Sequence, residues 1–328
     1  MRVKCGKYFL LCITCLLVLS CSKKAESNRP IKIALNTWSG YAHAYIAKEN
    51  GYFTKNGVQV ELVFEKDYQA SRKHYANGEV DGIFEVFSDA IMDFSEGIPS
   101  CVVYVADYSI HSDVILGKAE LKDLSDLKGK KIGIDSLNTF SNIFVIQALE
   151  NAGIKEQDVY IEVVPAQDVS SALDKGIIDA GHTWGPAKSE AIKRGYKVLA
   201  DAQYMKGIIV DVLVFNDSVI NKRPKEIKAV IKSLFEARDF LQNNRQEALQ
   251  IISGSEGINS LDAEEDLQGI IQPDVKENIM MMQKSDQTPS LFASGMIIIN
   301  FYMNRGQLSE APVLDKLIMP KFVEELEK

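Results

Sequence analysis

Both tryptophans of the 328-residue chain follow a short apolar run and precede a stretch with helical character. Trp38 lies in LNTWSGY and Trp184 lies in GHTWGP. An indole ring offers a flat face on which a small molecule can stack, and it attracts a cation if the ligand is an amine. Packing into a hydrophobic core is the alternative role for each ring. The position that the two residues share favours a binding role for the pair.

The residues that follow Trp38 extend this candidate site. Ser39 adds a hydroxyl group, Gly40 lets the backbone approach a ligand because it has no side chain, and Tyr41 adds a second aromatic ring. The alternative is that the two rings form a hydrophobic plug beneath the loop. We predict that these residues form a ligand-binding loop.

Acidic residues are frequent in the other candidate segments. Four carboxylates and one hydroxyl group stand close to predicted strand ends: Glu85, Ser88, Asp107, Asp113 and Asp211. A carboxylate within an apolar run, such as Asp211 in VDVLV, is costly unless it is paired or faces a ligand. Pairing with a backbone N–H group or a lysine is the alternative for Asp211, and helix capping is the alternative for Ser88.

The balance of charges in these segments gives a further indication about the ligand. No arginine lies in any candidate segment, and Lys206 is the nearest basic residue. A sulfonate or nitrate site would more naturally use an arginine or a lysine, although a helix start can suffice. The balance therefore favours a neutral or amine-bearing small molecule.

A second group of candidates opens a helix directly after a strand. Ser136, Asn138 and Thr139 lie in DSLNTFSN, where the free backbone N–H groups of a helix start favour an anion. Ordinary N-capping accounts for the same residues, and both roles can hold at once. Thr183 precedes Trp184 at the end of another apolar run and completes the candidate set.

The sequence lacks the motifs that common enzymes use. It contains no G-x-S-x-G, H-E-x-x-H, P-loop or G-x-G-x-x-G segment. Its four histidines are scattered and are not paired at metal-ligand spacing. We therefore expect a binding protein without a cofactor or metal, and not an enzyme.

The N-terminus indicates export. A basic start precedes an apolar run that is shorter than the about 20 residues of a membrane-spanning helix. The ending LVLSC matches a lipobox and predicts a signal peptide over 1–20, a lipid on Cys21 and a tether over 21–29. An ordinary signal peptide with a chance cysteine is the alternative. After cleavage and lipidation Cys101 is the one free thiol left, so no intrachain disulfide is possible.

The mature chain is acidic. Removing residues 1–20 takes away three of 37 basic residues and no acidic one, which leaves 34 basic and 45 acidic residues and a net charge near −11. An acidic protein without a lysine or arginine cluster is a poor candidate for nucleic-acid binding. We expect a monomer that binds a small molecule.

An internal repeat organises the first two thirds of the chain. One copy runs from IKIAL to GIFEV, and the other runs from KKIGI to DAGHTW. Each copy has a short apolar strand, a helix that stops near a glycine (Gly51 or Gly153), an alternating strand, and a second helix before a third strand. This β-α-β-α-β order predicts a parallel sheet covered by helices.

The repeat explains where the tryptophans lie. The carboxyl ends of parallel strands meet at one edge of a sheet, and ligands of open α/β sheets bind there. Trp38 and Trp184 follow such ends in different copies, which predicts a cleft between two lobes with one tryptophan on each side. A buried strand over 210–215 and a mostly helical C-terminal part have no counterpart in a third copy, so they must pack on an existing lobe.

The order and spacing of several short segments resemble the nitrate/sulfonate/taurine-type solute-binding proteins of ABC importers, a family that also includes binders of thiamine pyrimidine precursors. These segments include WSGY, AKENGYF, GEVDG, DLKGKKIGI and GIIDAGHTWGP, within residues 31–240. The resemblance implies an α/β fold of the type II periplasmic-binding-protein architecture, with a helix-flanked sheet in each lobe and two hinge crossovers. The lobes would comprise 30–112 with 214–328, and 113–213.

The resemblance also implies a role outside the cytoplasm. Such proteins trap a small molecule by lobe closure and deliver it to an ABC permease and its ATPase, and the lipid on Cys21 would hold this one to a bacterial membrane, in the periplasm or at the cell surface. Two alternatives stay open: a ligand-sensing module for a membrane receptor, and a pyrimidine-precursor enzyme of the same superfamily. That enzyme depends on a Cys-rich motif, which is missing here because Cys101 stands alone.

Overall fold

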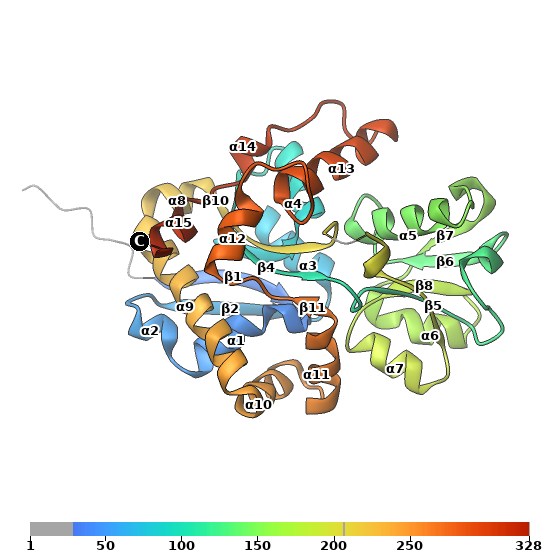
Figure 1. The fold of residues 1–328 in the computed structure, drawn as a ribbon, viewed down its shortest axis with the longest axis horizontal. Helices are drawn as coiled ribbons and strands as arrows, with labels where there is room; N and C mark the ends of the chain where they lie inside the picture. Colours follow the sequence, from blue (N-terminus) through green and yellow to red (C-terminus); the bar gives the residue numbers. More distant parts are fainter. Residues whose placement is uncertain (1–28, 206, 328) are drawn as a thin grey trace, which may run out of the picture.

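The computed structural model describes residues 29–205 and 207–327, which form two lobes side by side (Figure 1). The predicted signal peptide, the predicted lipid site at Cys21 and all of the predicted tether except Arg29 lie outside the described residues, so these features stay predictions. Arg29 donates to both carboxylate oxygens of Asp81 at 2.6 Å, which fixes the start of the described chain against the first lobe.

The first lobe contains a six-stranded sheet in the order β11-β4-β10-β3-β1-β2. Its strands are β1 (Ile31–Asn36), β2 (Val60–Glu65), β3 (Gly82–Val86), β4 (Ser100–Ser109), β10 (Val210–Asn216) and β11 (Ile270–Ile271). β1 pairs in parallel with β2 and β3, whereas β10 runs antiparallel between β3 and β4. β3, β4 and most of β10 are buried, as expected for central strands whose two faces are both covered.

The second lobe contains a five-stranded sheet in the order β7-β6-β8-β5-β9. Its strands are β5 (Val114–Gly117), β6 (Lys131–Ile134), β7 (Tyr160–Val163), β8 (Ala180–Thr183) and β9 (Lys197–Asp201). β6 pairs in parallel with β7 and β8, and β5 runs antiparallel between β8 and β9.

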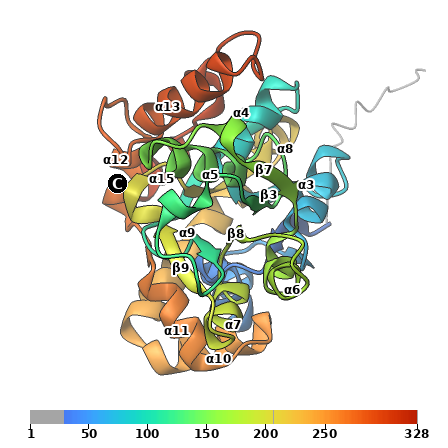
Figure 2. The ribbon, with the colours of Figure 1, turned by 90° about the vertical axis from the view of Figure 1, so that its right-hand side faces the viewer.

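Helices cover both sheets, and Figure 2 looks at the molecule from the side of the second lobe. The second lobe has α5 (Phe140–Asn151), α6 (Val169–Asp174) and α7 (Ala187–Lys193). The first lobe has α1 (Ala42–Glu49), α2 (Tyr52–Lys55), α3 (Tyr68–Ala76), α4 (Phe87–Ser95), α8 (Asp217–Lys222), α9 (Pro224–Asn243), α10 (Arg245–Glu256), α11 (Ser260–Gln268), α12 (Val275–Met282), α13 (Leu291–Asn304), α14 (Leu314–Leu317) and α15 (Lys321–Glu327). Over the described ranges, none of these helices combines the length and apolarity that crossing a lipid bilayer requires.

Local sequence signals explain several helix starts. The Asp67 side chain accepts the N–H of Gln69 at 2.9 Å and caps α3. Pro224 occupies the first turn of α9, where its missing N–H has no intrahelical partner to lose. Asp274 and Glu277 form a reciprocal capping box at the start of α12.

The predicted repeat is confirmed by strand pairing. The first parallel strand of each copy, β1 or β6, lies between the second and the third, so the spatial orders β2-β1-β3 and β7-β6-β8 match. Both sheets are nevertheless mixed, because the antiparallel strands β4, β10, β5 and β9 extend them. The repeat predicted the parallel part alone, because hydrophobic periodicity does not specify which strands become neighbours.

Two crossings join the lobes, one between β4 and β5 and one between β9 and β10. The expected first boundary at 112/113 falls between the strands of the first crossing. The expected second boundary at 213/214 would divide β10, but all of β10 pairs within the first sheet. We therefore propose that the second boundary lies before Val210.

Candidate functional site

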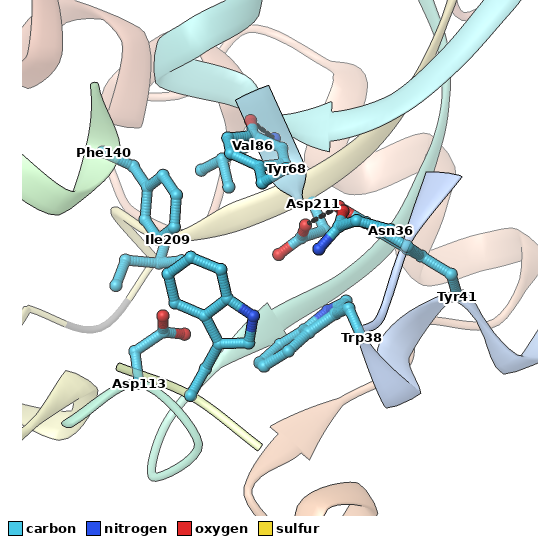
Figure 3. A pocket seen from close by; sticks show the side chains of 10 residues that line it. Asn36, Trp38, Tyr41, Tyr68, Val86, Asp113, Phe140, Ile209 and Asp211 are labelled. Carbon is cyan, nitrogen blue, oxygen red and sulfur yellow. Dashed lines mark hydrogen bonds between the residues drawn. The ribbon is translucent and has the colours of Figure 1, made fainter. Parts of the chain in front are cut away.

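A small cavity of about 20 Å³ lies where the carboxyl ends of β1 and β3 face the second lobe. Its lining residues are Asn36, Trp38, Tyr41, Tyr68, Val86, Asp113, Phe140, Trp184, Ile209 and Asp211 (Figure 3). Trp184 and Phe140 come from the second lobe, and Asp113 and Ile209 come from the two crossings. Five predicted site residues therefore meet at one cavity, although their roles in binding stay predictions.

The two tryptophans lie on opposite lobes, as predicted from their positions after β1 and β8. They are 5% and 8% exposed, so each ring is also packed against protein. The Trp184 ring lies 5.3 Å from Phe140 and 6.5 Å from Tyr68 between ring centroids. The binding and core alternatives are thus not exclusive here, because the cavity wall is itself made of packed aromatic rings.

Asp107 lies directly behind Trp38 and is fully buried. Its Oδ2 accepts a hydrogen bond from Trp38 Nε1 at 3.1 Å. A Cβ atom on Gly40 would lie only 1.9 Å from the same oxygen. The missing side chain of Gly40 therefore makes room for Asp107, and not for a ligand as we expected.

Asp211 points from β10 toward the cavity and accepts the hydroxyl proton of Tyr41 at 2.5 Å. Burial raises the pKa of Asp211 to about 8, and the nearby Asp113 and Asp89 carboxylates add to the shift. Burial also raises the pKa of Asp107 well above its usual value, with Asp211 contributing through charge repulsion. Burial thus favours the protonated form of Asp211 and Asp107, and no lysine or arginine lines the cavity to offset their charge when they ionise.

Asp113 belongs to a hydrogen-bond chain with His182 and Ser141, all of them buried. His182 Nε2 lies 3.2 Å from Asp113 Oδ1, and His182 Nδ1 lies 2.8 Å from Ser141 Oγ. The Ser141 oxygen already accepts the N–H of Asp135 at 2.9 Å, so its own proton is free to go to Nδ1. This arrangement lets the Nε2–H of His182 donate to Asp113.

Sequence reasoning missed half of the cavity wall. The missed lining residues are Asn36, Tyr68, Val86, Phe140 and Ile209. Two of them adjoin predicted residues, since Phe140 follows Thr139 and Asn36 ends the strand before Trp38. The sequence around Tyr68 does not mark it as a cavity residue. It meets Phe140 and Trp184 only because the two lobes pack against each other in the folded protein.

Ser39 and Thr183 are buried but do not line this cavity. The Ser39 hydroxyl donates to Glu256 of α10 at 3.0 Å. Burial raises the pKa of Glu256 to about 8. The Thr183 hydroxyl donates to the carbonyl oxygen of Ala166 at 2.8 Å. Both hydroxyl groups hold the loops that carry the tryptophans.

Glu85 and Ser88 also lie away from the cavity, contrary to our expectation. Successive side chains of a strand point to opposite faces, so Val86 lines the cavity while Glu85 points away from it. Glu85 is fully buried, with an oxygen 3.8 Å from Arg72 Nε. The Ser88 hydroxyl donates to the neighbouring Asp89 at 3.2 Å.

The predicted anion position at the start of α5 is occupied by a carboxylate of the first lobe. Asp89 Oδ1 accepts the backbone N–H of Phe140 at 2.8 Å, the contact that a bound anion makes at a helix start. Ser136, Asn138 and Thr139 do not line the cavity. Asn138 is exposed, and Thr139 donates to the carbonyl oxygen of Ser136 at 2.8 Å. Our expectation of a ligand anion at this helix start is therefore corrected.

Polar contacts join the lobes around the cavity. Gln69 Nε2 donates to Asp135 Oδ2 at 2.9 Å. Further out, Arg305 forms an ion pair with Glu156 at 2.6 Å. Together with Asp89 at the start of α5, these contacts describe a closed arrangement of the two lobes.

Comparison with known proteins agrees with this geometry. The NMT1/THI5-like family model matches residues 38–248. The chain belongs to the NMT1/THI5-like family. The matched range includes most of the cavity wall and both crossings. The resemblance inferred from the short sequence segments is thereby confirmed.

Individual relatives of this NMT1/THI5-like protein carry several names. It is 30% identical over 178 residues to a Haemophilus influenzae protein named for thiamine biosynthesis, which covers 53% of this chain and 54% of the relative. It is 28% identical over 147 residues to the taurine-binding periplasmic protein of Escherichia coli, which covers 44% of this chain and 45% of the relative. The chain thus spans about half the length of these two relatives.

Solved structures show the same fold. The ligand-binding component of an ABC-type import system from Staphylococcus aureus superposes with a TM-score of 0.75 at 15% identity, covering 90% of this chain and 98% of that one. The predicted two-lobed α/β architecture is confirmed by this likeness and by the two helix-flanked sheets.

Proposed function

We propose that this NMT1/THI5-like protein is the extracytoplasmic solute-binding component of an ABC importer. The observation that carries the proposal is the closed cavity, which takes Trp38 and Asp211 from one lobe and Trp184 and Phe140 from the other. A ligand held by both lobes favours the closed arrangement because it contacts both walls at once. The permease and its ATPase would then receive the ligand from the closed protein.

Binding fits the site better than catalysis. Ser141, His182 and Asp113 have the residue types of a hydrolytic triad, and they are joined by hydrogen bonds. The Ser141 side chain is fully buried and its oxygen accepts the N–H of Asp135, so it is not presented to a substrate. Burial raises the pKa of the Cys101 thiol to about 12, which opposes a nucleophilic role.

Location follows from the predicted lipobox. We propose that a lipid on Cys21 holds the protein at the outer side of a bacterial membrane, as a monomer. Cys21→Ala should release the protein from the membrane fraction, and inhibition of lipoprotein signal peptidase should leave an uncleaved precursor. Normal membrane retention of the Cys21→Ala protein would contradict the lipid anchor without affecting the proposal for the cavity.

The central experiment measures ligand binding and lobe closure together. Purified protein is screened with amines, sulfonates, nitrate, pyrimidines and amino acids while tryptophan fluorescence is recorded, since both tryptophans line the cavity. A ligand should change the fluorescence, raise the melting temperature and reduce the radius of gyration in small-angle scattering. An unchanged radius at saturation would argue against closure around the ligand.

Transport and sensing differ in what happens after binding. A strain that lacks the protein should lose uptake of the identified ligand if the protein serves an importer. Unimpaired uptake with a lost transcriptional or chemotactic response would favour the sensing module.

A further inference from the structure

We propose that the cavity takes a small organic cation that carries N–H donors, a protonated amine or an amidinium. The inference rests on the proposed function, because it names the class of solute that the same site binds. Four observations support it. Some acceptor oxygens of the cavity have no hydrogen-bond donor, and several donors of the wall already bond to protein carboxylates. The lining includes no lysine or arginine, and its walls are aromatic.

The first observation concerns oxygen atoms without partners. Asn36 Oδ1, Asp107 Oδ1 and Asp113 Oδ2 are buried and have no hydrogen-bond donor. Asn36 and Asp113 line the cavity, and Asp107 lies directly behind Trp38. A buried acceptor that stays unpaired costs free energy, so a donor is expected from water or a ligand. The two oxygens that belong to lining residues, on Asn36 and Asp113, favour a ligand with more than one N–H group.

The second observation concerns the donors of the cavity wall. Trp38 Nε1 donates to Asp107, and the Tyr41 hydroxyl donates to Asp211. The Tyr68 hydroxyl donates to a carboxylate of α4 at 2.8 Å. These polar hydrogens are already committed to protein carboxylates. A sulfonate or nitrate would meet carboxyl acceptors over much of the wall, and the indole N–H of Trp184 is the donor that these contacts leave.

The third observation concerns charge. Asp113 and Asp211 line the cavity, and its lining includes no lysine or arginine. Among the described residues, the one basic side chain paired with either carboxyl group is His182, whose Nε2 lies 3.2 Å from Asp113 Oδ1. A carboxylate removed from water is costly unless a cation and hydrogen bonds compensate it. At the start of α5, the N–H of Phe140, a lining residue, is already bonded to Asp89.

The fourth observation concerns the walls. Among the described residues, no three His, Cys, Asp or Glu side chains are grouped so that they could hold a metal ion. The rings of Trp38 and Phe140 lie beside the carboxyl groups (Figure 3), and Trp184 lines the same cavity. Aromatic faces attract an organic cation and also stack on its flat or apolar part. The cavity volume of about 20 Å³ has room for about one water molecule, so the walls must move apart to admit a ligand, and that ligand must be small.

The test compares ligands that differ in charge but little in shape. Benzamidine carries a flat amidinium, benzamide is its neutral isostere, and benzenesulfonate places an anion on the same ring. Small aliphatic amines and their alcohol isosteres extend the comparison to non-aromatic ligands. Calorimetric titration of the wild-type protein should show the cations binding about tenfold or more tightly than their isosteres.

Variants then locate the charge. Asp113→Asn and Asp211→Asn should each weaken binding of the best cation about tenfold or more and leave its neutral isostere unaffected. Asp286→Asn is the matched control, because Asp286 is exposed and does not line the cavity. If an Asp113 or Asp211 variant fails to fold, the isostere comparison in the wild-type protein still decides the proposal.

The outcomes separate this inference from the proposed function. Preferential binding of cations that depends on Asp113 or Asp211 supports it. Equal or tighter binding of neutral or sulfonate compounds overturns the cation inference and leaves solute binding in place. Failure of every compound class to bind overturns the cation inference and counts against the proposed solute-binding function as well.

Discussion

Buried carboxylates gather in two neighbouring places, and the two groups differ in what neutralises them. The α3–α4 cluster consists of Arg72, Glu85, Asp89 and Asp93. The cavity acids are Asp107, Asp113 and Asp211. Arg72 lies within ion-pair distance of all three acids of its cluster, whereas in the described part of the chain no lysine or arginine forms an ion pair with the cavity acids.

The comparison separates acids that are neutralised within the protein from acids that we propose to contact a ligand. Asp89 is satisfied within the protein, since it receives the Tyr68 hydroxyl, the Phe140 N–H and the charge of Arg72. Asp211 receives one hydroxyl proton, from Tyr41. Acidic residues of similar burial thus have different roles because an arginine reaches one group and does not reach the other.

The largest effect is expected from removing the one cation of the α3–α4 cluster. Arg72→Met leaves Glu85, Asp89 and Asp93 buried without their cation, so the free energy of unfolding should fall by about 3–5 kcal/mol. Urea unfolding followed by circular dichroism measures the change. Arg72→Lys is the control, because it keeps the charge and should recover part of the loss. A stable Arg72→Met protein would show that these carboxyl groups are protonated and need no partner.

A smaller effect is expected behind the cavity wall. Trp38→Phe keeps an aromatic ring but removes the donor to Asp107, and an unsatisfied buried acceptor costs about 1–3 kcal/mol of stability. Trp184→Phe is the matched variant in the other lobe, where no contact with Asp107 is lost. Equal stability of the two variants in thermal unfolding would contradict the importance of the Trp38–Asp107 hydrogen bond.

The cavity acids should also make the stability of the free protein depend on pH. Asp211 faces Tyr41, Asp89, Asp107 and Asp113, and its pKa of about 8 lies above the value near 3.9 of an unfolded aspartate. The folded state therefore keeps a proton that the unfolded state has released. Stability should fall as pH rises between these two values, by up to about 1.4 kcal/mol per pH unit.

Asp211→Asn provides the comparison for this pH dependence. Burial also raises the pKa of Glu256 to about 8 and that of Asp266 to about 7, so both groups contribute a similar slope in either protein. Chemical unfolding at pH 5, 6, 7 and 8 should therefore give a shallower decline for Asp211→Asn than for the wild type. Parallel declines would mean that Asp211 titrates as an ordinary carboxyl group.

The smallest expected effect concerns the contact that joins the lobes at the surface. Arg305 and Glu156 are partly exposed, and such an ion pair contributes about 0.2–1 kcal/mol. Glu156→Gln should weaken ligand binding by a few-fold at most, because it destabilises the closed arrangement without altering the cavity. The effect should disappear in high salt, and a loss that persists there would point to a role beyond charge.

Several features could be predicted because they depend on local order. The β-α-β-α-β repeat follows from hydrophobic periodicity and from the helix stops at Gly51 and Gly153. The parallel pairing of β1 with β2 and β3 follows from the crossover helices, and it brings the residues after β1 and β8 to the interlobe face. Trp38 and Trp184 were accordingly predicted at their observed places.

Other features depend on which face a side chain occupies. Glu85 and Val86 are adjacent, yet one contacts Arg72 and the other lines the cavity, because a strand alternates its side chains. A short buried strand gives no sequence signal for which of its faces meets the cleft. The prediction for Glu85 therefore failed, while that for Asp211 placed it at the cavity.

The sequence by itself determined the two lobes, the edges at which their strands end and the surplus of acidic residues near those edges. The tertiary structure alone decided which acids are neutralised. Arg72 and the start of α5 lie far from Asp89 in sequence, and the packing of α3 against β3 and the approach of the second lobe bring all three together. Charge compensation depends on distance in space and on burial, and neither quantity can be read from the order of residues.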